Sequence, residues 1–274
     1  MGLIFNNEQG IKNKAAFNAI KATLHPGFMG KLRIGISLEE ALQMDTLILL
    51  PWKNQRCDGI VDLDFLKFFP SLTVLSIESK GLSNIDGLKF CPNLIEVELG
   101  SDWLRSLDFF MFRECKKLES ILVYNPDFAD GKGERGSSST DIRNIDTLAQ
   151  LPELVSLNLF DLGIRDIRFV QSMQSVKEVY LDGNPISDFS PLQGHPSVEL
   201  LGLHRCGVTD ISFLVEIPAL KRITVSKNNI RDFSPLKEMK NLKNVAAWGN
   251  GLSSHEIEKW KNELQHIKEL ELED

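Results

Sequence analysis

The sequence lacks long hydrophobic runs and has few cysteines. Among its 274 residues, no window approaches the roughly eighteen uninterrupted apolar residues that a membrane-spanning helix needs. The four cysteines, Cys57, Cys91, Cys115 and Cys206, show no CxxC spacing. We therefore expect no membrane span, no zinc or other metal site and no redox-active pair.

An excess of positive charge is also missing. The formal net charge is -7, and the pI is near 5.4. Proteins that bind phosphate backbones usually gather excess Lys and Arg on one face, so nucleic acid is not an expected partner. The first ten residues, MGLIFNNEQG, lack the basic start and apolar core of a secretory signal, which favours a cytoplasmic location.

What the sequence does contain is a repeated phrase. The stretch VYLDGNPISDFSPL begins at Val179, and ITVSKNNIRDFSPL begins forty-four residues later at Ile223. An LxxLxL pattern recurs with spacings of 28, 22, 24, 36, 22, 22, 22 and 22 residues. Such a fixed period is typical of stacked-repeat architectures. The first residues of the nine copies are Met44, Leu72, Leu94, Leu118, Leu154, Val176, Val198, Leu220 and Leu242.

The repeat resembles the leucine-rich repeat family. Its 22-residue length and D-[IF]-x-x-L ending are similar to the class in bacterial internalins and in a eukaryotic phosphatase regulatory subunit, over about residues 44–272. The resemblance implies an α/β solenoid: a curved right-handed superhelix with a concave parallel β-sheet, short helical or 3₁₀ turns on the convex side, and helical caps. It also implies protein recognition.

Three columns of the repeat have structural explanations. Position 9 holds Asn184, Asn228 and Asn250, with Cys206 in the same column, and an amide there can pair backbone groups of the turn. Position 20 is an apolar column, in which His195 is interpreted as a hydrogen-bonded core residue. Position 13 carries residue types that cap helical turns, namely Asp62, Asn84, Ser106, Asn144, Asp166, Asp188, Asp210, Asp232 and Ser254.

We divide the chain into three parts. Residues 1–43 form an N-terminal cap, with a helix that places Ile11, Ala15 and Ile20 at helical spacing and a strand in KLRIGIS. Residues 44–252 form about nine coils, interrupted by a Gly- and Ser-rich insert at 127–141 that reads as a flexible loop. Residues 253–274 form a C-terminal cap, with a Ser253 to Glu256 capping box and a final strand.

No catalytic motif stands out in this framework. The sequence has no GxSxG, P-loop or HExxH. His204 and Cys206 are the residue types of a nucleophile pair, but position 7 faces outward and position 9 inward, so their side chains should diverge. We therefore predict a protein that is not an enzyme and needs no cofactor.

The concave face is the predicted binding surface. Tyr124, Phe160, Tyr180 and Trp248 point out of the sheet, and aromatic and Arg side chains dominate binding hot spots. We predict a monomeric module that binds a protein partner there. The alternative is a small-ligand binder or enzyme on the floor near Tyr124, Asp182 and His204, with the 127–141 loop as a lid. The predicted partner-binding residues are Tyr124, Phe160, Tyr180, Asp182, His204, Arg205, Arg222 and Trp248.

Overall fold

A computed structural model describes residues 3–7, 9–24, 35–50, 57–101, 106–126 and 140–273. The predicted insert lies outside the described residues except for Thr140 and Asp141, as does the first part of KLRIGIS. The chain forms two compact units. Unit 1 comprises Met1–Gly131 and Thr140–Leu154, and unit 2 comprises Lys132–Ser139 and Val155–Asp274. The division into caps and repeats at residues 43 and 252 stays a prediction.

Unit 1 contains parallel strands separated by 3₁₀ turns. Leu47 pairs with Leu75, and Leu75 with Val97, which is the register that the repeat spacing predicts. A small parallel pair, β6 (Ser106–Asp108) and β8 (Asp141–Arg143), lies outside the main strands. The main strands are β3 (Thr46–Leu49), β4 (Val74–Glu78), β5 (Glu96–Gly100) and β7 (Ser120–Tyr124). The 3₁₀ turns are η1 (Cys57–Gly59), η2 (Asp64–Phe68), η3 (Asp86–Phe90), η4 (Phe109–Phe112) and η5 (Ile145–Gln150).

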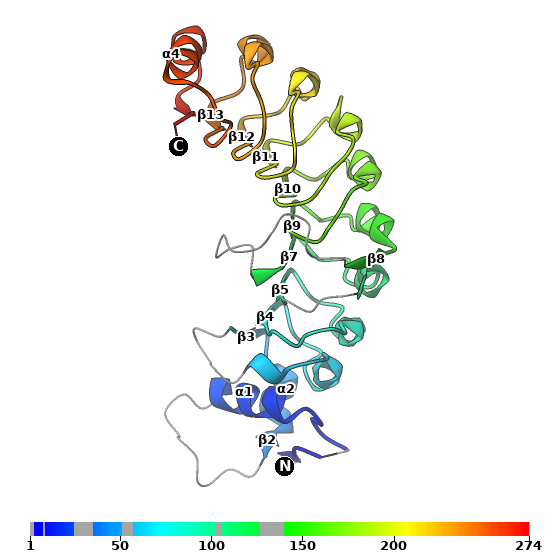
Figure 1. Ribbon diagram of the computed structural model, residues 1–274. Coiled ribbons are helices and arrows are strands. Elements are labelled where there is room, and N and C mark those ends of the chain that lie inside the picture. Colours follow the sequence, from blue (N-terminus) through cyan, green and yellow to red (C-terminus); the bar gives the residue numbers. More distant parts are fainter. Residues whose placement is uncertain are drawn as a thin grey trace. The chain divides into compact units, whose positions relative to one another are not determined.

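Unit 2 repeats the same plan with greater regularity. Val179 pairs with Leu201, Leu201 with Ile223, and Ile223 with Val245, each a step of 22 residues. Its strands lie on one side and its 3₁₀ turns on the other (Figure 1). The strands are β9 (Ser156–Phe160), β10 (Glu178–Tyr180), β11 (Leu200–Gly202), β12 (Arg222–Thr224), β13 (Asn244–Ala246) and β14 (Glu269–Glu271). The turns are η6 (Arg168–Ser172), η7 (Ser190–Leu192), η8 (Ser212–Glu216) and η9 (Ser234–Glu238).

The core consists of the inward columns that the repeat predicts. Strand positions 4 and 6 are buried in every coil, as Leu201 and Leu203 illustrate. The position 20 column is buried as well, and His195 within it hydrogen-bonds the Val170 carbonyl oxygen through Nε2 at 3.2 Å. Burial lowers the pKa of His195, which keeps this core histidine neutral. The parallel strands, intervening 3₁₀ turns and helical caps confirm the predicted solenoid class.

The asparagine column pairs the backbone as predicted. The Asn184 amide donates to the carbonyl oxygens of Leu159 and Leu181 and accepts from the N–H groups of Leu162 and Ile164, at 2.7–3.0 Å. The Leu159 carbonyl oxygen and the N–H groups of Leu162 and Ile164 lie in the buried interior of the coils, where backbone groups need a partner. Asn228 likewise donates to two carbonyl oxygens and accepts from two N–H groups, and Asn250 donates to two carbonyl oxygens and accepts from the Ile230 N–H.

In unit 1, serine hydroxyls pair buried carbonyl oxygens from position 8, one position earlier in the repeat. The Ser79 hydroxyl donates to the Ile60 carbonyl oxygen at 2.9 Å, and the Ser101 hydroxyl donates to the Leu82 carbonyl oxygen at 2.7 Å. Both serines are buried. The sequence analysis did not identify these serines, because it searched for the amide only at position 9.

Most of the position 13 residues cap a turn, but three do not. Asp188, for example, accepts from the Ser190 N–H at 2.8 Å, two residues further on. Ser106 instead lies in β6, and Asp108 caps the following turn. Asn144 adopts a left-handed conformation with φ 54° and makes no cap bond. Ser254 is the first residue of α4, and Ser253 is its cap.

Helices lie at both ends of the described chain. At the N-terminus, α1 (Lys14–Leu24) buries Ala16 and Phe17, whereas the predicted Ile11 precedes the helix. Strand β1 (Leu3–Ile4) pairs antiparallel with β2 (Ile36–Ser37), followed by α2 (Leu38–Gln43). At the C-terminus, α4 (Ser254–Glu263) begins with the predicted capping box. None of the helices in the described part of the chain is long and apolar enough to cross a membrane.

Candidate functional site

The sheet face, meaning the side chains on the outer side of the parallel strands and of the three residues that follow each strand, holds every predicted site residue. In unit 1 its centre is Tyr124. The Tyr124 hydroxyl donates to Glu78 at 2.6 Å and contacts Glu98 at 3.4 Å, and Glu98 also accepts from the Ser76 hydroxyl. Burial, together with the hydrogen bond and charge of Glu78, raises the pKa of Tyr124. Tyr124 is therefore neutral, and its hydroxyl hydrogen-bonds the carboxylates of Glu78 and Glu98.

Tyr124 lies across the neighbouring coil because Gly100 leaves room for it. A Cβ atom added at Gly100 would lie 2.6 Å from the Tyr124 ring and 2.9 Å from the Glu78 side chain. Such distances are well below a van der Waals contact. The glycine thus allows the tyrosine to reach Glu78, two strands away.

In unit 2 the central feature is a pair of rings. The His204 and Trp248 ring centroids are 5.3 Å apart and tilted by 51°. Both residues are half-buried, and Ser226, at the same position of the coil between them, is fully buried. The Lys227 ammonium lies 4.8 Å from the Trp248 ring centroid, within the range of a cation–π interaction. The four residues form a cluster of aromatic and cationic groups that reaches solvent.

Asp182 connects this cluster to Tyr180. Its Oδ1 accepts from the backbone N–H of His204 at 2.8 Å. A Cβ atom added at Gly202 would lie 2.3 Å from the Tyr180 ring and 2.9 Å from Asp182 Oδ1, so Tyr180 lies directly over this glycine. Tyr180 and Asp182 of the β10 segment are thereby packed against the backbone of the next segment, which comprises β11 and the turn after it.

The pKa values of Asp182 and His204 are shifted in opposite directions. Burial raises the pKa of Asp182 to about 6, although the hydrogen bond from the His204 N–H favours the charged form. Burial, with the charges of Lys227 and Arg205, lowers the pKa of His204 to about 4. His204 is therefore neutral at pH 7, and its ring can pack on Trp248 without bringing in a positive charge.

Arg205 and Lys227 have an unusual backbone conformation. Both occupy position 8 of their coils with positive φ angles, 55° and 51°. In neighbouring coils the same position is held by Gly183 and Gly249, with φ of 77° and 72°. Left-handed backbone is disfavoured for residues with a Cβ atom. The sequence analysis could have found this constraint from the two glycines in the column.

Two further predicted residues lie at the margins of the unit 2 face. Phe160 ends β9 and is half-buried, and Arg222 begins β12 and is exposed. The positive charge of Arg222 opposes the rise in the Tyr180 pKa that burial causes, which shows that these side chains interact. The face thus carries seven of the eight predicted residues in unit 2, and Tyr124 in unit 1. Sequence analysis omitted Ser226, Lys227 and Gly202 from the site.

The structure also bears on the chemical alternatives. In the described part of the chain, no group of three or more His, Cys, Asp or Glu residues could hold a metal ion. The Cys206 thiol is buried and donates to the Leu181 carbonyl oxygen at 3.2 Å. Burial raises the pKa of Cys91 to about 12 and that of Cys115 to about 11, so both thiols are unreactive. The ligand-site alternative stays a prediction, since its lid lies outside the described residues.

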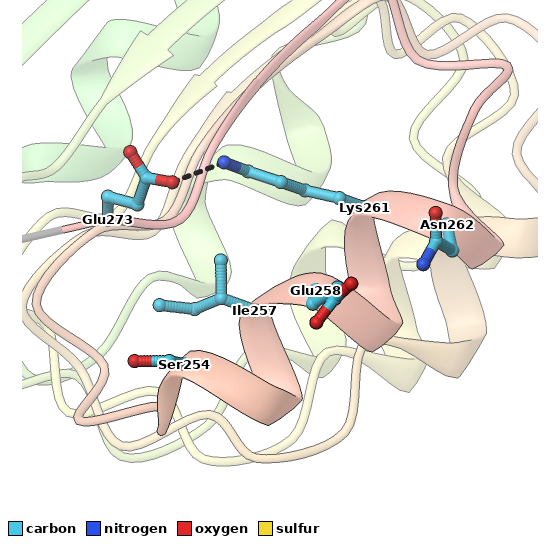
Figure 2. Close-up of a pocket in the computed structure, with 6 residues that line it drawn as sticks. All are labelled: Ser254, Ile257, Glu258, Lys261, Asn262 and Glu273. Carbon is cyan, nitrogen blue, oxygen red and sulfur yellow. Dashed lines mark hydrogen bonds and ion pairs between the residues drawn. The ribbon is translucent and has the colours of Figure 1, made fainter.

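A separate groove lies on the C-terminal cap (Figure 2). An ion pair between Lys261 and Glu273 crosses it. Its lining is mostly polar or charged and lacks an aromatic anchor, unlike the sheet face of unit 2. The lining residues are Ser254, Ile257, Glu258, Lys261, Asn262 and Glu273.

Comparison with solved structures identifies the fold. An internalin from Listeria monocytogenes, InlF, superposes with a TM-score of 0.58 and 19% identity, covering 95% of this chain and 82% of that chain. Internalin C2 from the same organism gives a TM-score of 0.56 and 20% identity, covering 96% and 94%. No protein-family model and no curated protein matches the sequence. Together with the 22-residue register, these likenesses show that the chain has the leucine-rich repeat solenoid fold seen in the internalins.

Proposed function

We propose that the chain is a non-enzymatic module that binds one protein partner on the sheet face of unit 2. The observation that carries the proposal is the cluster of His204, Trp248 and Lys227, in which rings and a cation pack together yet remain partly exposed. Leucine-rich repeat folds commonly serve as protein-binding modules, and the two internalins show the same fold. Fold alone does not assign a function, so the site must support it.

The physical properties of the cluster suit protein recognition. Trp, Tyr and Arg are the residues most enriched in binding hot spots, and Trp248, Tyr180 and Arg205 supply one of each on this face. The rings are held by their neighbours, so little side-chain freedom is lost when a partner binds. A rigid, partly apolar surface edged with charge is typical of an interface.

A capture experiment tests the proposal. The parent chain and a Tyr180→Ala, Trp248→Ala variant are immobilised, and proteins retained from native lysate are identified by mass spectrometry. Val215→Ala is the matched control, because Val215 is a large exposed residue of η8 on the turn side of the same unit. We expect a partner that the parent and the Val215 variant retain and the double variant loses. Equal retention by all three would place the binding surface elsewhere.

A further inference from the structure

We propose that the partner inserts one tyrosine side chain between the His204 and Trp248 rings, with its hydroxyl bound to the Ser226 hydroxyl beneath them. This inference rests on the proposed function and names the side chain that the site recognises. The observation behind it is a buried hydroxyl without a partner. The Ser226 Oγ atom is fully buried and forms no hydrogen bond within the part of the chain that the structure describes.

The backbone places Ser226 midway between the two rings. The Arg205 N–H donates to the Ser226 carbonyl oxygen at 3.0 Å, and the Lys227 N–H donates to the Trp248 carbonyl oxygen at 2.7 Å. These bonds continue the parallel pairing of β11, β12 and β13 past the ends of the strands. His204, Ser226 and Trp248 are therefore neighbours in one row across the sheet face, with Ser226 in the middle.

The two rings lean toward each other over Ser226. Neighbouring strands of a sheet are about 4.8 Å apart, so backbones two strands apart are separated by about 9–10 Å. The ring centroids of His204 and Trp248 are only 5.3 Å apart. Ser226 points out of the sheet, because the preceding residue, Val225, lies in the core, and yet Ser226 is fully buried. The ring pair is thus what covers the Ser226 hydroxyl.

A third ring fits between His204 and Trp248 when both stand upright. Half of the backbone separation is about 4.8 Å, which lies within the roughly 4.5–7 Å between centroids at which aromatic rings pack. Burial and neighbouring charges lower the pKa of His204 to about 4, so the inserted ring meets a neutral imidazole at pH 7. The partner's ring replaces the contact that His204 and Trp248 lose, so each ring is held by a neighbour before and after binding.

The unpaired hydroxyl favours tyrosine over phenylalanine. A hydrogen bond between two molecules usually gains little, because both groups first give up bonds to water. Ser226 is already out of contact with water in the unbound chain, so a bond to its hydroxyl requires no such loss on this side. Phenylalanine would fill the same space and leave Ser226 unpaired. We expect tyrosine to bind about ten-fold more tightly than phenylalanine, which is the ratio that one net hydrogen bond gives.

The test is selection from a displayed library of random dodecapeptides on the parent chain. We expect enrichment of Tyr, in peptides that bind a folded Trp248→Ala variant more weakly than the parent. Replacing that Tyr by Phe in a resynthesised peptide should weaken binding to the parent about ten-fold and leave binding to Ser226→Ala unchanged. Thr224→Ala is the matched control, because Thr224 lies on the same side of the same coil, two residues before Ser226. This control variant should keep the preference for Tyr.

The melting temperature of Ser226→Ala provides a second measurement that needs no peptide. Because the hydroxyl has no partner in the unbound chain, removing it should leave the melting temperature unchanged or raise it. A lower melting temperature would mean that the hydroxyl stabilises the fold, and the inference would then be wrong.

Other outcomes separate this inference from the proposed function. Peptides that need Trp248 but lack Tyr would overturn the inserted tyrosine and leave the binding site in place. A preference for Tyr over Phe that Ser226→Ala does not change would do the same. Peptides that bind Trp248→Ala as well as the parent, or the absence of any enriched peptide, would contradict both the inference and the proposed site.

Discussion

Replacing Asn228 by Ala should destabilise unit 2 by several kcal/mol. The side chain donates to the carbonyl oxygens of Leu203 at 2.9 Å and Val225 at 2.8 Å, and accepts from the N–H groups of Gly207 at 2.8 Å and Val208 at 3.0 Å. Alanine cannot make any of these bonds. Those of the four backbone groups that are buried and have no second partner cannot form a replacement hydrogen bond with bulk water.

The magnitude follows from which groups lose their partner. Val225 O still accepts from Asn250 at 3.1 Å, and Gly207 is half-buried and within reach of water. The Leu203 carbonyl and the Val208 N–H are left buried and unpaired. Each costs about 1–3 kcal/mol, so we expect a loss of about 2–6 kcal/mol. That is a large part of the roughly 5–15 kcal/mol by which most domains are stable.

Urea denaturation followed by circular dichroism measures this loss as a change in the free energy of unfolding. The matched control is Asn229→Ala, since Asn229 is the next residue but is exposed, and surface changes usually stay within about 0.5 kcal/mol. Asn228→Asp is a further comparison, because it keeps the acceptor oxygen and loses the donor to Leu203. If Asn228→Ala and Asn229→Ala unfold at the same urea concentration, the asparagine column does not stabilise the coils.

Three further outcomes are expected. Ser253→Ala removes the cap of α4 and should cost about 1 kcal/mol, visible as faster amide exchange in that helix. The raised pKa of Asp182 makes the free energy of unfolding fall as the pH rises from about 4 to 6. The lowered pKa of His204 makes the free energy of unfolding rise as the pH goes from about 4 to 6.5. The two effects therefore oppose each other. Denaturation at pH 4 and pH 7 should therefore show a steeper rise for Asp182→Asn than for the parent. Glu78→Gln removes a charge that raises the pKa of Tyr124, so spectrophotometric titration should show this tyrosine ionising at lower pH.

The regular part of the fold follows directly from the sequence because every coil faces the same constraints. A 22-residue step puts Leu201, Ile223 and Val245 in one buried column, and only apolar residues fit there. One wrong prediction arose where that step is broken. Near Met111 the coil has two extra residues, and the residue that caps the turn is Asp108 rather than the predicted Ser106. When a repeat position is counted across an insertion, the residue assigned to that position is displaced by the number of inserted residues.

Side-chain contacts on the sheet face were less predictable than the face itself. Alternation along a strand correctly indicated that Tyr124, Tyr180 and Trp248 point away from the core. It gave no information on where a long side chain goes after leaving the sheet. That depends on the residue 22 or 24 positions away, which is Gly100 beneath Tyr124 and Gly202 beneath Tyr180.

On this face, therefore, a large aromatic residue on one coil lies over a small residue on the neighbouring coil. Gly100, Gly202 and Ser226 each allow a ring from an adjacent coil to pack over the sheet, and the ring then meets a polar group. The consequence differs between the two units. In unit 1 the Tyr124 hydroxyl already donates to Glu78, so removing Tyr124 would change the packing of that face itself, whether or not a partner binds there. In unit 2 the Lys227 ammonium lies over the Trp248 ring, which stays partly exposed, so removing Trp248 would take away a surface that is open to solvent.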